Sequence, residues 1–161
     1  MSFKRKEFGF TLIEIVIVVA IIGLLAAIAI PLFLRSKVNA NENAMKTELR
    51  AFSSSSESYR AAQNPPAYAP NIVALTAGGG PPYLDPSWAA GPRHGFNLTY
   101  NVGAPPATTF SLVATPQVQG QTGLNIYCID QTGVIVSSTN EGTANVPTGA
   151  GTGCAGGVPI P

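Results

Sequence analysis

An uninterrupted apolar segment near the N-terminus constrains this chain more than any other feature. It runs from Phe10 to Leu34, contains 25 residues and carries a single charge, at Glu14. A helix of roughly 20 apolar residues crosses a bilayer, so this segment is long enough to span a membrane. Three of the nine basic residues stand ahead of it, at positions 4–6, and basic residues favour the cytoplasmic side. We therefore expect a single-pass anchor with a cytoplasmic N-terminus.

A secretory signal peptide is the alternative interpretation of the same segment. Ala27, Ile28 and Ala29 form a small-x-small site at which a signal peptidase could cleave. That interpretation explains neither the carboxylate of Glu14 inside the apolar region nor the amphipathic helical pattern that continues beyond the supposed cleavage site. We therefore expect the segment to be retained as an anchor.

The start of the apolar segment carries a short motif, Lys4-Arg5-Lys6-Glu7-Phe8-Gly9 followed by Phe10-Thr11-Leu12-Ile13-Glu14. This motif resembles the N-terminal motif of type IV prepilins and type II secretion pseudopilins. The resemblance continues to Pro31 and covers only the N-terminal part of the chain. It implies that a prepilin peptidase and N-methyltransferase removes residues 1–9 as a leader, cuts between Gly9 and Phe10, and methylates the new amine of Phe10.

The same resemblance implies how such a subunit assembles. Identical subunits form a helical filament through their N-terminal helices, with the help of an inner-membrane assembly platform. The subunit lies in the inner membrane before assembly and in a cell-surface or periplasmic filament afterwards. Residues 10–34 are then both the transmembrane segment and the assembly helix.

Glu14 is the candidate assembly residue. A carboxylate in hydrocarbon is costly and is normally retained only for function. The resemblance implies a partner for it, the methylated amine of Phe10 on a neighbouring subunit. By position alone, Glu14 could instead snorkel to the interface or be protonated.

Two residues predict a soft region in the same helix. Pro31 lacks a backbone donor and clashes with the preceding turn, so it should kink or loosen the helix, and Gly23 adds a second soft point. The resemblance to the prepilin family implies that this region can be partly unwound in a filament. A tolerated membrane-helix proline without any role explains Pro31 equally well.

The helical pattern continues beyond Leu34 as an amphipathic stretch, residues 35–63. Its apolar residues recur at helical spacing, which predicts one face packed against a sheet: Val38, Met45, Leu49, Phe52 and Tyr59. Glu42 precedes Lys46 by four positions, an arrangement typical of a solvated face. Pro65-Pro66 ends the helix, so a helix from Phe10 to about Ala62 would be ~80 Å long.

The rest of the chain predicts a small sheet. Residues 64–94 are rich in Pro and Gly and indicate a connecting loop, with a short helical turn possible at Ile72 to Leu75. The glycine triplet at 78–80 lacks the context of a phosphate loop. Residues 95–136 predict an antiparallel meander of three to four strands, at 96–102, 110–114, 124–129 and 134–136. The expected fold class is α+β, with the long helix packed on this sheet.

The C-terminal tail, residues 137–161, is rich in Gly, Thr, Ala and Pro and should fray unless it is tethered. Cys128 and Cys154 are the only cysteines and lie 26 positions apart. If the globular part is exported, an oxidising compartment favours a disulfide between them. Two free thiols are the alternative.

The composition excludes several function classes. Charged residues make up 11% of the chain and the net charge is +1, which predicts no nucleic-acid partner. His94 is the sole histidine, the cysteines lack metal-ligand spacing and no acidic pair stands out in the globular part, so we expect no catalytic residue, metal or cofactor, and no enzyme. The leading hypothesis is a structural subunit of a type IV pilus. The alternatives are a major pseudopilin-like subunit of type II secretion and a membrane-anchored monomeric binding module.

Overall fold

The computed structural model describes residues 9–77, 80–139, 148–151 and 153–160. Residues 1–8 of the expected leader therefore lie outside the described residues. The chain divides into two compact units, Met1–Ser36 and Lys37–Pro161. The expected fold class, a long N-terminal helix followed by an antiparallel sheet, is confirmed.

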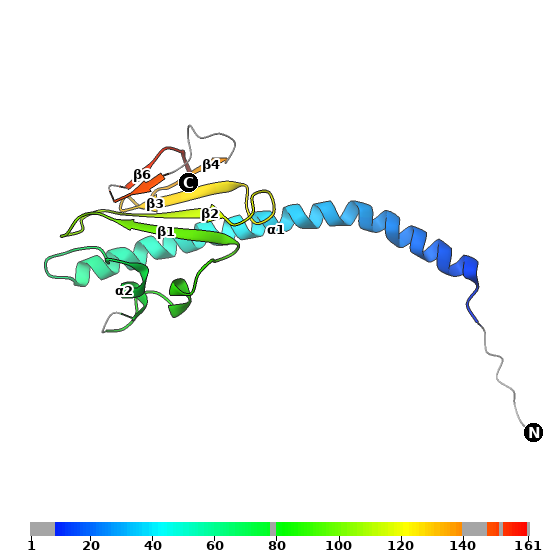
Figure 1. The fold of residues 1–161 in the computed structure, drawn as a ribbon, viewed down its shortest axis with the longest axis horizontal. Coiled ribbons are helices and arrows are strands. Elements are labelled where there is room, and N and C mark those ends of the chain that lie inside the picture. Colours follow the sequence, from blue (N-terminus) through cyan, green and yellow to red (C-terminus); the bar gives the residue numbers. More distant parts are fainter. Residues whose placement is uncertain (1–8, 78–79, 140–147, 152, 161) are drawn as a thin grey trace, which may run out of the picture. The chain divides into compact units, whose positions relative to one another are not determined.

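Helix α1 spans Leu12–Ala62 and is the first element of the chain (Figure 1). Its N-terminal part contains a window with a mean hydropathy of 3.1, none of it buried, that is long and apolar enough to cross a membrane. The helix continues without interruption through Gly23 and Pro31, so the expected kink stays a prediction. It ends at Ala62, as predicted, just before the Pro65-Pro66 pair.

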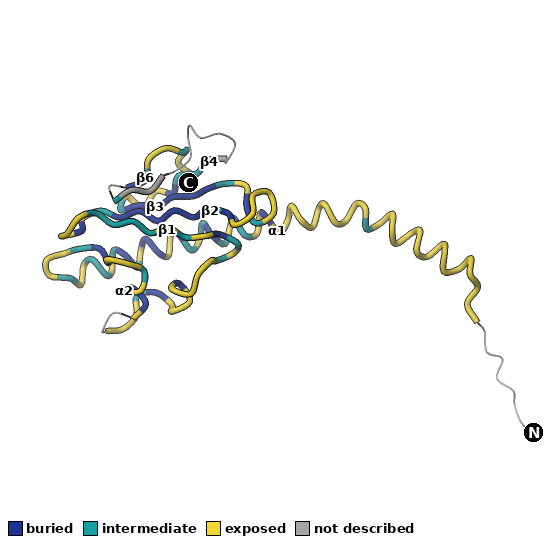
Figure 2. The backbone as a smooth tube through the Cα atoms, in the orientation of Figure 1, coloured by how far each residue is buried: buried dark blue, intermediate teal, exposed yellow. Residues whose placement is uncertain are grey.

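Within the second unit, one face of α1 enters the core. Val38, Met45, Leu49 and Phe52 are buried, and Tyr59 packs against the same core. Figure 2 shows buried residues in dark blue along the part of α1 that lies beside the sheet. The predicted stripe is therefore correct. The solvated face assigned to Glu42 is wrong, because this side chain is only 7% exposed. Glu42 follows Val38 by four residues and so shares its face of the helix.

The main sheet has five strands in the order β1-β2-β3-β4-β7, and every neighbouring pair is antiparallel. Four of them lie where alternation predicted strands, although β4 is longer than expected. A fifth strand makes the expected count of three to four too low. Their bounds are β1 Phe96–Val102, β2 Phe110–Pro116, β3 Asn125–Asp130, β4 Ile135–Thr139 and β7 Val158–Ile160.

The segment expected to be a tail contributes structure of its own. β7 pairs with β4, with Val136 opposite Pro159, so the end of the chain belongs to the sheet. β5 (Thr148–Ala150) and β6 (Gly153–Ala155) form a separate hairpin that contacts β1, β2 and β3. Figure 1 shows β6 on the side of the sheet away from α1.

The expected connecting loop also folds over the core. It contains helix α2 (Ile72–Ala77) and a short 3₁₀ helix, η1 (Pro86–Ala89). Leu75 and Trp88 from these elements are buried. The Trp88 ring lies 5.2 Å from the ring of Phe52 on α1, measured between centroids. An aromatic core thus ties the region to both the helix and the sheet.

Candidate assembly site

The predicted cleavage and assembly residues surround the start of α1. Gly9 and Phe10 precede the helix, and the Phe10 residue is 82% exposed. The carboxylate of Glu14 contacts Thr11 instead of a distant partner. Its Oε2 accepts hydrogen bonds from the Thr11 backbone N–H at 3.2 Å and from Thr11 Oγ1 at 3.1 Å.

Thr11 and Glu14 form a reciprocal helix cap. The backbone N–H of Glu14 donates to Thr11 Oγ1 at 3.3 Å, while the Glu14 carboxylate returns to the Thr11 backbone. This exchange satisfies two donors that a helix N-terminus otherwise leaves free. Sequence reasoning missed the role of Thr11, although the Thr-x-x-Glu spacing is the known signature of such a cap. Among the described residues, no hydrogen bond joins Glu14 to Phe10.

The apolar surface that follows this cap is exposed along the whole first part of α1. Its large apolar residues are about half to four-fifths exposed in the isolated chain, from Leu12 at 82% to Leu34 at 56%. A soluble monomer rarely exposes apolar surface on this scale, so such a surface marks contact with lipid or with other protein. Gly23 and Pro31 lie within it, both in helical conformation.

A second polar contact fixes α1 to the sheet. Glu42 Oε1 accepts the backbone N–H groups of Leu124 at 2.7 Å and Asn125 at 2.9 Å, and also Asn125 Nδ2 at 3.1 Å. One residue earlier, Asn41 Nδ2 donates to the backbone carbonyl of Thr122 at 3.1 Å. These bonds attach the connection between β2 and β3 to the helix.

A third contact joins α1 to the turn before β1. Arg93 donates from Nε and Nη2 to the two carboxylate oxygens of Glu48, each at 2.6 Å, and His94 Nε2 lies 3.0 Å from Glu48 Oε1. Burial alone would raise the pKa of Glu48, but hydrogen bonds and positive charge from Arg93 and His94 lower it below its usual value. The Arg93 guanidinium also lies 4.7 Å from the Trp88 ring centroid. This cluster of ionic contacts connects α1 to the turn before β1.

The two cysteines form the disulfide expected from their pairing, with Cα atoms 5.9 Å apart. It joins β3 to β6 on the face of the sheet opposite α1, within a small cluster that includes Val113 and Ile126. Asp130 reinforces it. Its Oδ2 accepts the backbone N–H of Cys154 at 2.9 Å, and its Oδ1 accepts that of Thr132 at 2.9 Å.

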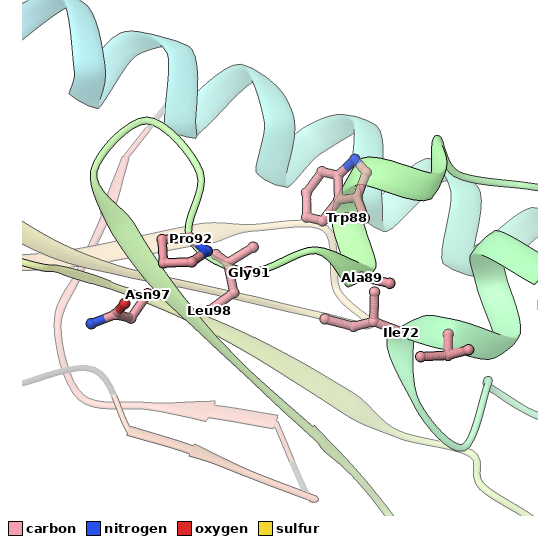
Figure 3. Close-up of a pocket in the computed structure, with 8 residues that line it drawn as sticks. Ile72, Trp88, Ala89, Gly91, Pro92, Asn97 and Leu98 are labelled. Atoms are coloured by element: carbon pink, nitrogen blue, oxygen red, sulfur yellow. The ribbon is translucent and has the colours of Figure 1, made fainter.

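The structure also contains a pocket of about 350 Å³ between β1 and the region of α2 and η1 (Figure 3). None of its lining residues titrates, so it offers no acid, base or nucleophile. No group of three or more metal-ligating side chains occurs among the described residues. The lining residues are Ile72, Val73, Trp88, Ala89, Gly91, Pro92, Asn97 and Leu98.

The N-terminal segment of the chain matches a known protein family. The family described as the prokaryotic N-terminal methylation motif matches residues 4–30. The type IV major pilin protein PilA of Myxococcus xanthus is 47% identical over 57 residues, which are 35% of this chain and 26% of that protein. The fimbrial protein EcpB of Eikenella corrodens is 40% identical over 82 residues, covering 51% and 42%. The type II secretion system core protein G of Vibrio cholerae is 35% identical over 60 residues, covering 37% and 41%.

Parts of the chain are therefore similar to type IV pilins and to a core protein of type II secretion. It spans less than half the length of each of these three relatives, and the family motif covers only residues 4–30 of this chain. No solved structure matches the chain. The methylation motif and the apolar helix together fit a subunit that is anchored in a membrane and later assembles into a filament.

Proposed function

We propose that this chain is the structural subunit of a type IV pilus and polymerises through α1 into a cell-surface filament. The observation that carries the proposal is the exposed apolar surface of α1, which begins directly after a prepilin-type motif. In water that surface would be unfavourable, so it needs lipid before assembly and other copies of the helix afterwards. The proposed role is structural and includes no enzymatic activity or cofactor.

Processing is the first step of the proposed pathway. A prepilin peptidase and N-methyltransferase cuts between Gly9 and Phe10, removes residues 1–9 and methylates the amine of Phe10. Gly9 and Phe10 are both exposed ahead of α1, which supports access to this bond. Before assembly, residues 10–34 anchor the subunit in the inner membrane with the N-terminus on the cytoplasmic side.

Assembly then uses the new amine. The cationic amine of Phe10 on one subunit pairs with Glu14 of its neighbour, so that two buried charges neutralise each other. In the isolated chain Glu14 is bonded to Thr11, so pairing would exchange a contact within the subunit for one between subunits. Gly23 and Pro31 allow the helix to bend or loosen as it packs, and an inner-membrane assembly platform adds each subunit.

A type II secretion pseudopilus is the second candidate function. Core protein G of Vibrio cholerae matches a stretch of 60 residues at 35% identity, below the 47% identity of the pilin of Myxococcus xanthus. The fimbrial protein of Eikenella corrodens matches a longer stretch, of 82 residues, which favours the pilus. A monomeric, membrane-anchored binding module would need no pairing of Glu14.

Intact-mass analysis of sheared filaments, combined with a Glu14 variant, tests the proposal. The mature chain should begin at a methylated Phe10, whereas a chain beginning at Ile30 would contradict the pilin interpretation. Glu14→Ala should enter the membrane fraction normally but yield few sheared filaments. The buried amine of the neighbouring subunit would lose its partner, at a free-energy cost of ~3 to 5 kcal/mol. Normal filament yield from this variant would favour packing as the sole driver. Long filaments would favour a pilus and short periplasmic ones a pseudopilus.

A further inference from the structure

The connection between β2 and β3, residues 117–124, is a compact loop held by several hydrogen bonds. The backbone N–H groups of Gln121 and Thr122 donate to the carbonyl of Val118 at 3.1 and 2.9 Å, and that of Gly120 donates to Gly123 at 2.9 Å. The bonds from Asn41 and Glu42 then hold the loop on α1. We call residues 117–124 the β2–β3 loop.

Two aliphatic side chains project from this loop into solvent. Val118 is 47% exposed and Leu124 is 49% exposed. The loop contains no charged residue, and the remaining surface is formed by glutamine, threonine and glycine. An uncharged, hydrogen-bonded loop that presents two aliphatic side chains resembles a surface that inserts shallowly into a bilayer interface.

The position of the loop along the chain brings it close to the membrane. It is fixed to Asn41 and Glu42, and the apolar segment ends at Leu34. Seven residues of helix rise about 10 Å, so at most this distance separates Leu34 from Asn41, whatever the direction in which residues 12–36 leave the second unit. A headgroup region is roughly 5 to 8 Å deep on each side of the hydrocarbon. Asn41, to which the loop is hydrogen-bonded, therefore lies within or just outside the headgroup region while the subunit is anchored.

The charges around the loop favour an anionic surface. Arg35 and Lys37 are the only charged residues from position 15 to position 41, and both are exposed. The next acidic residue, Glu42, is 7% exposed and its carboxylate is bonded to the backbone of the loop. Basic side chains near a membrane are attracted to anionic lipids by about 1 kcal/mol each.

We propose that the β2–β3 loop is a membrane contact, in which Val118 and Leu124 insert among anionic lipid headgroups beside Lys37. The contact would hold the globular unit at the bilayer surface before assembly. This inference rests on the proposed function, because it requires the anchored subunit. Under the proposed function the subunit leaves the membrane when it assembles, and the contact would be broken at that step.

Quenching by brominated lipids tests the contact. The mature chain, residues 10–161, is reconstituted into vesicles of phosphatidylcholine and phosphatidylglycerol that carry bromine near the headgroup end of the acyl chain. Leu124→Trp places a fluorophore on the loop, and the emission of Trp88 in the parent chain is subtracted. Val134→Trp is the matched control, because Val134 is 45% exposed in the turn between β3 and β4. That turn lies near Ser53, about 16 Å further along α1 than Glu42.

The inference predicts loss of emission for L124W in brominated vesicles, unchanged emission for V134W, and weaker quenching when phosphatidylglycerol is omitted. Val118→Trp repeats the measurement if near-ultraviolet circular dichroism shows that L124W is misfolded. Equal emission with and without bromine for the loop variants, in a chain that floats with the vesicles, would overturn this inference alone. A chain that does not float with the vesicles would overturn the anchor as well. Loop emission that changes only on filament assembly would assign the loop to a subunit interface and overturn the membrane contact.

Discussion

Removal of the Glu42 carboxylate should destabilise the globular unit, and the structure indicates by how much. Glu42 Oε1 accepts two backbone N–H groups, from Leu124 and Asn125, at 2.7 and 2.9 Å. A hydrogen bond to a charged group contributes about 1.5 to 3 kcal/mol. The β2–β3 loop is partly exposed, so the lower value applies to each bond, and Glu42→Ala should cost about 3 kcal/mol of unfolding free energy.

The Glu42→Gln variant separates charge from shape. Its amide oxygen can still accept both backbone donors, but neutral hydrogen bonds are roughly half as strong as charge-assisted ones. We therefore expect a loss of about 1.5 kcal/mol, half that of the alanine variant. Asn43→Ala is the control, because Asn43 is exposed on the same helix and should change stability by less than about 0.5 kcal/mol.

Urea unfolding of the mature chain in detergent micelles measures these values. The fluorescence of Trp88 reports on the globular unit, since its ring packs on Phe52. Hydrogen exchange should show faster exchange at the amides of Leu124 and Asn125 in the alanine variant than in the glutamine variant. An alanine variant as stable as the Asn43→Ala control would refute the assignment of Glu42 as the attachment point of the loop.

Three further predictions concern other contacts of the chain. Cys128→Ser should release the β5–β6 hairpin and cost roughly 3 to 4 kcal/mol; limited proteolysis should then cut this variant faster than the parent, and identical patterns would contradict a tethering role. The pKa of Glu48 is lowered from its usual value of 4.5, so the ionised carboxylate stabilises the folded state at pH values above 4.5. Stability, measured as Tm against pH, should therefore fall as the pH drops below 4.5, and Glu48→Gln should flatten that dependence. Thr11→Val should cost about 1 kcal/mol at the helix N-terminus, seen as faster amide exchange at residues 12–15 in micelles with membrane insertion unchanged.

Periodicity predicted most of the fold. The apolar stripe of α1 has helical spacing over many turns, and strands β1 to β4 alternate or form apolar runs, so each carries its own local signal. β7 carries none, because three residues with a central proline show no period and indicate no strand. It becomes a strand only because β4 presents a free edge to it, a fact of tertiary structure.

The contacts of the candidate site also fall into two groups, those that local spacing predicts and those that depend on tertiary structure. The Thr11-x-x-Glu14 cap depends on residues three apart, so it could have been predicted from the sequence alone. Glu42 was misassigned because its spacing to Lys46 suggested a surface ion pair, whereas its register with Val38 places it on the buried face. Its true partners come from more than 80 residues later in the chain. Local spacing cannot reveal a contact over that separation.

Two carboxylates on α1 thus hold backbone donors, and their surroundings imply opposite roles. Glu42 is buried and accepts hydrogen bonds from the β2–β3 loop and the start of β3. Breaking these bonds would leave the backbone N–H groups of Leu124 and Asn125 without their acceptor. Glu14 is exposed and caps its own helix, and both of its donors come from Thr11. Because water or a neighbouring cation can replace such a cap at small cost, Glu14 can remain satisfied in the anchored subunit and still exchange partners during assembly. Glu42 fixes the globular unit to the helix, and Glu14 leaves the helix free to join another.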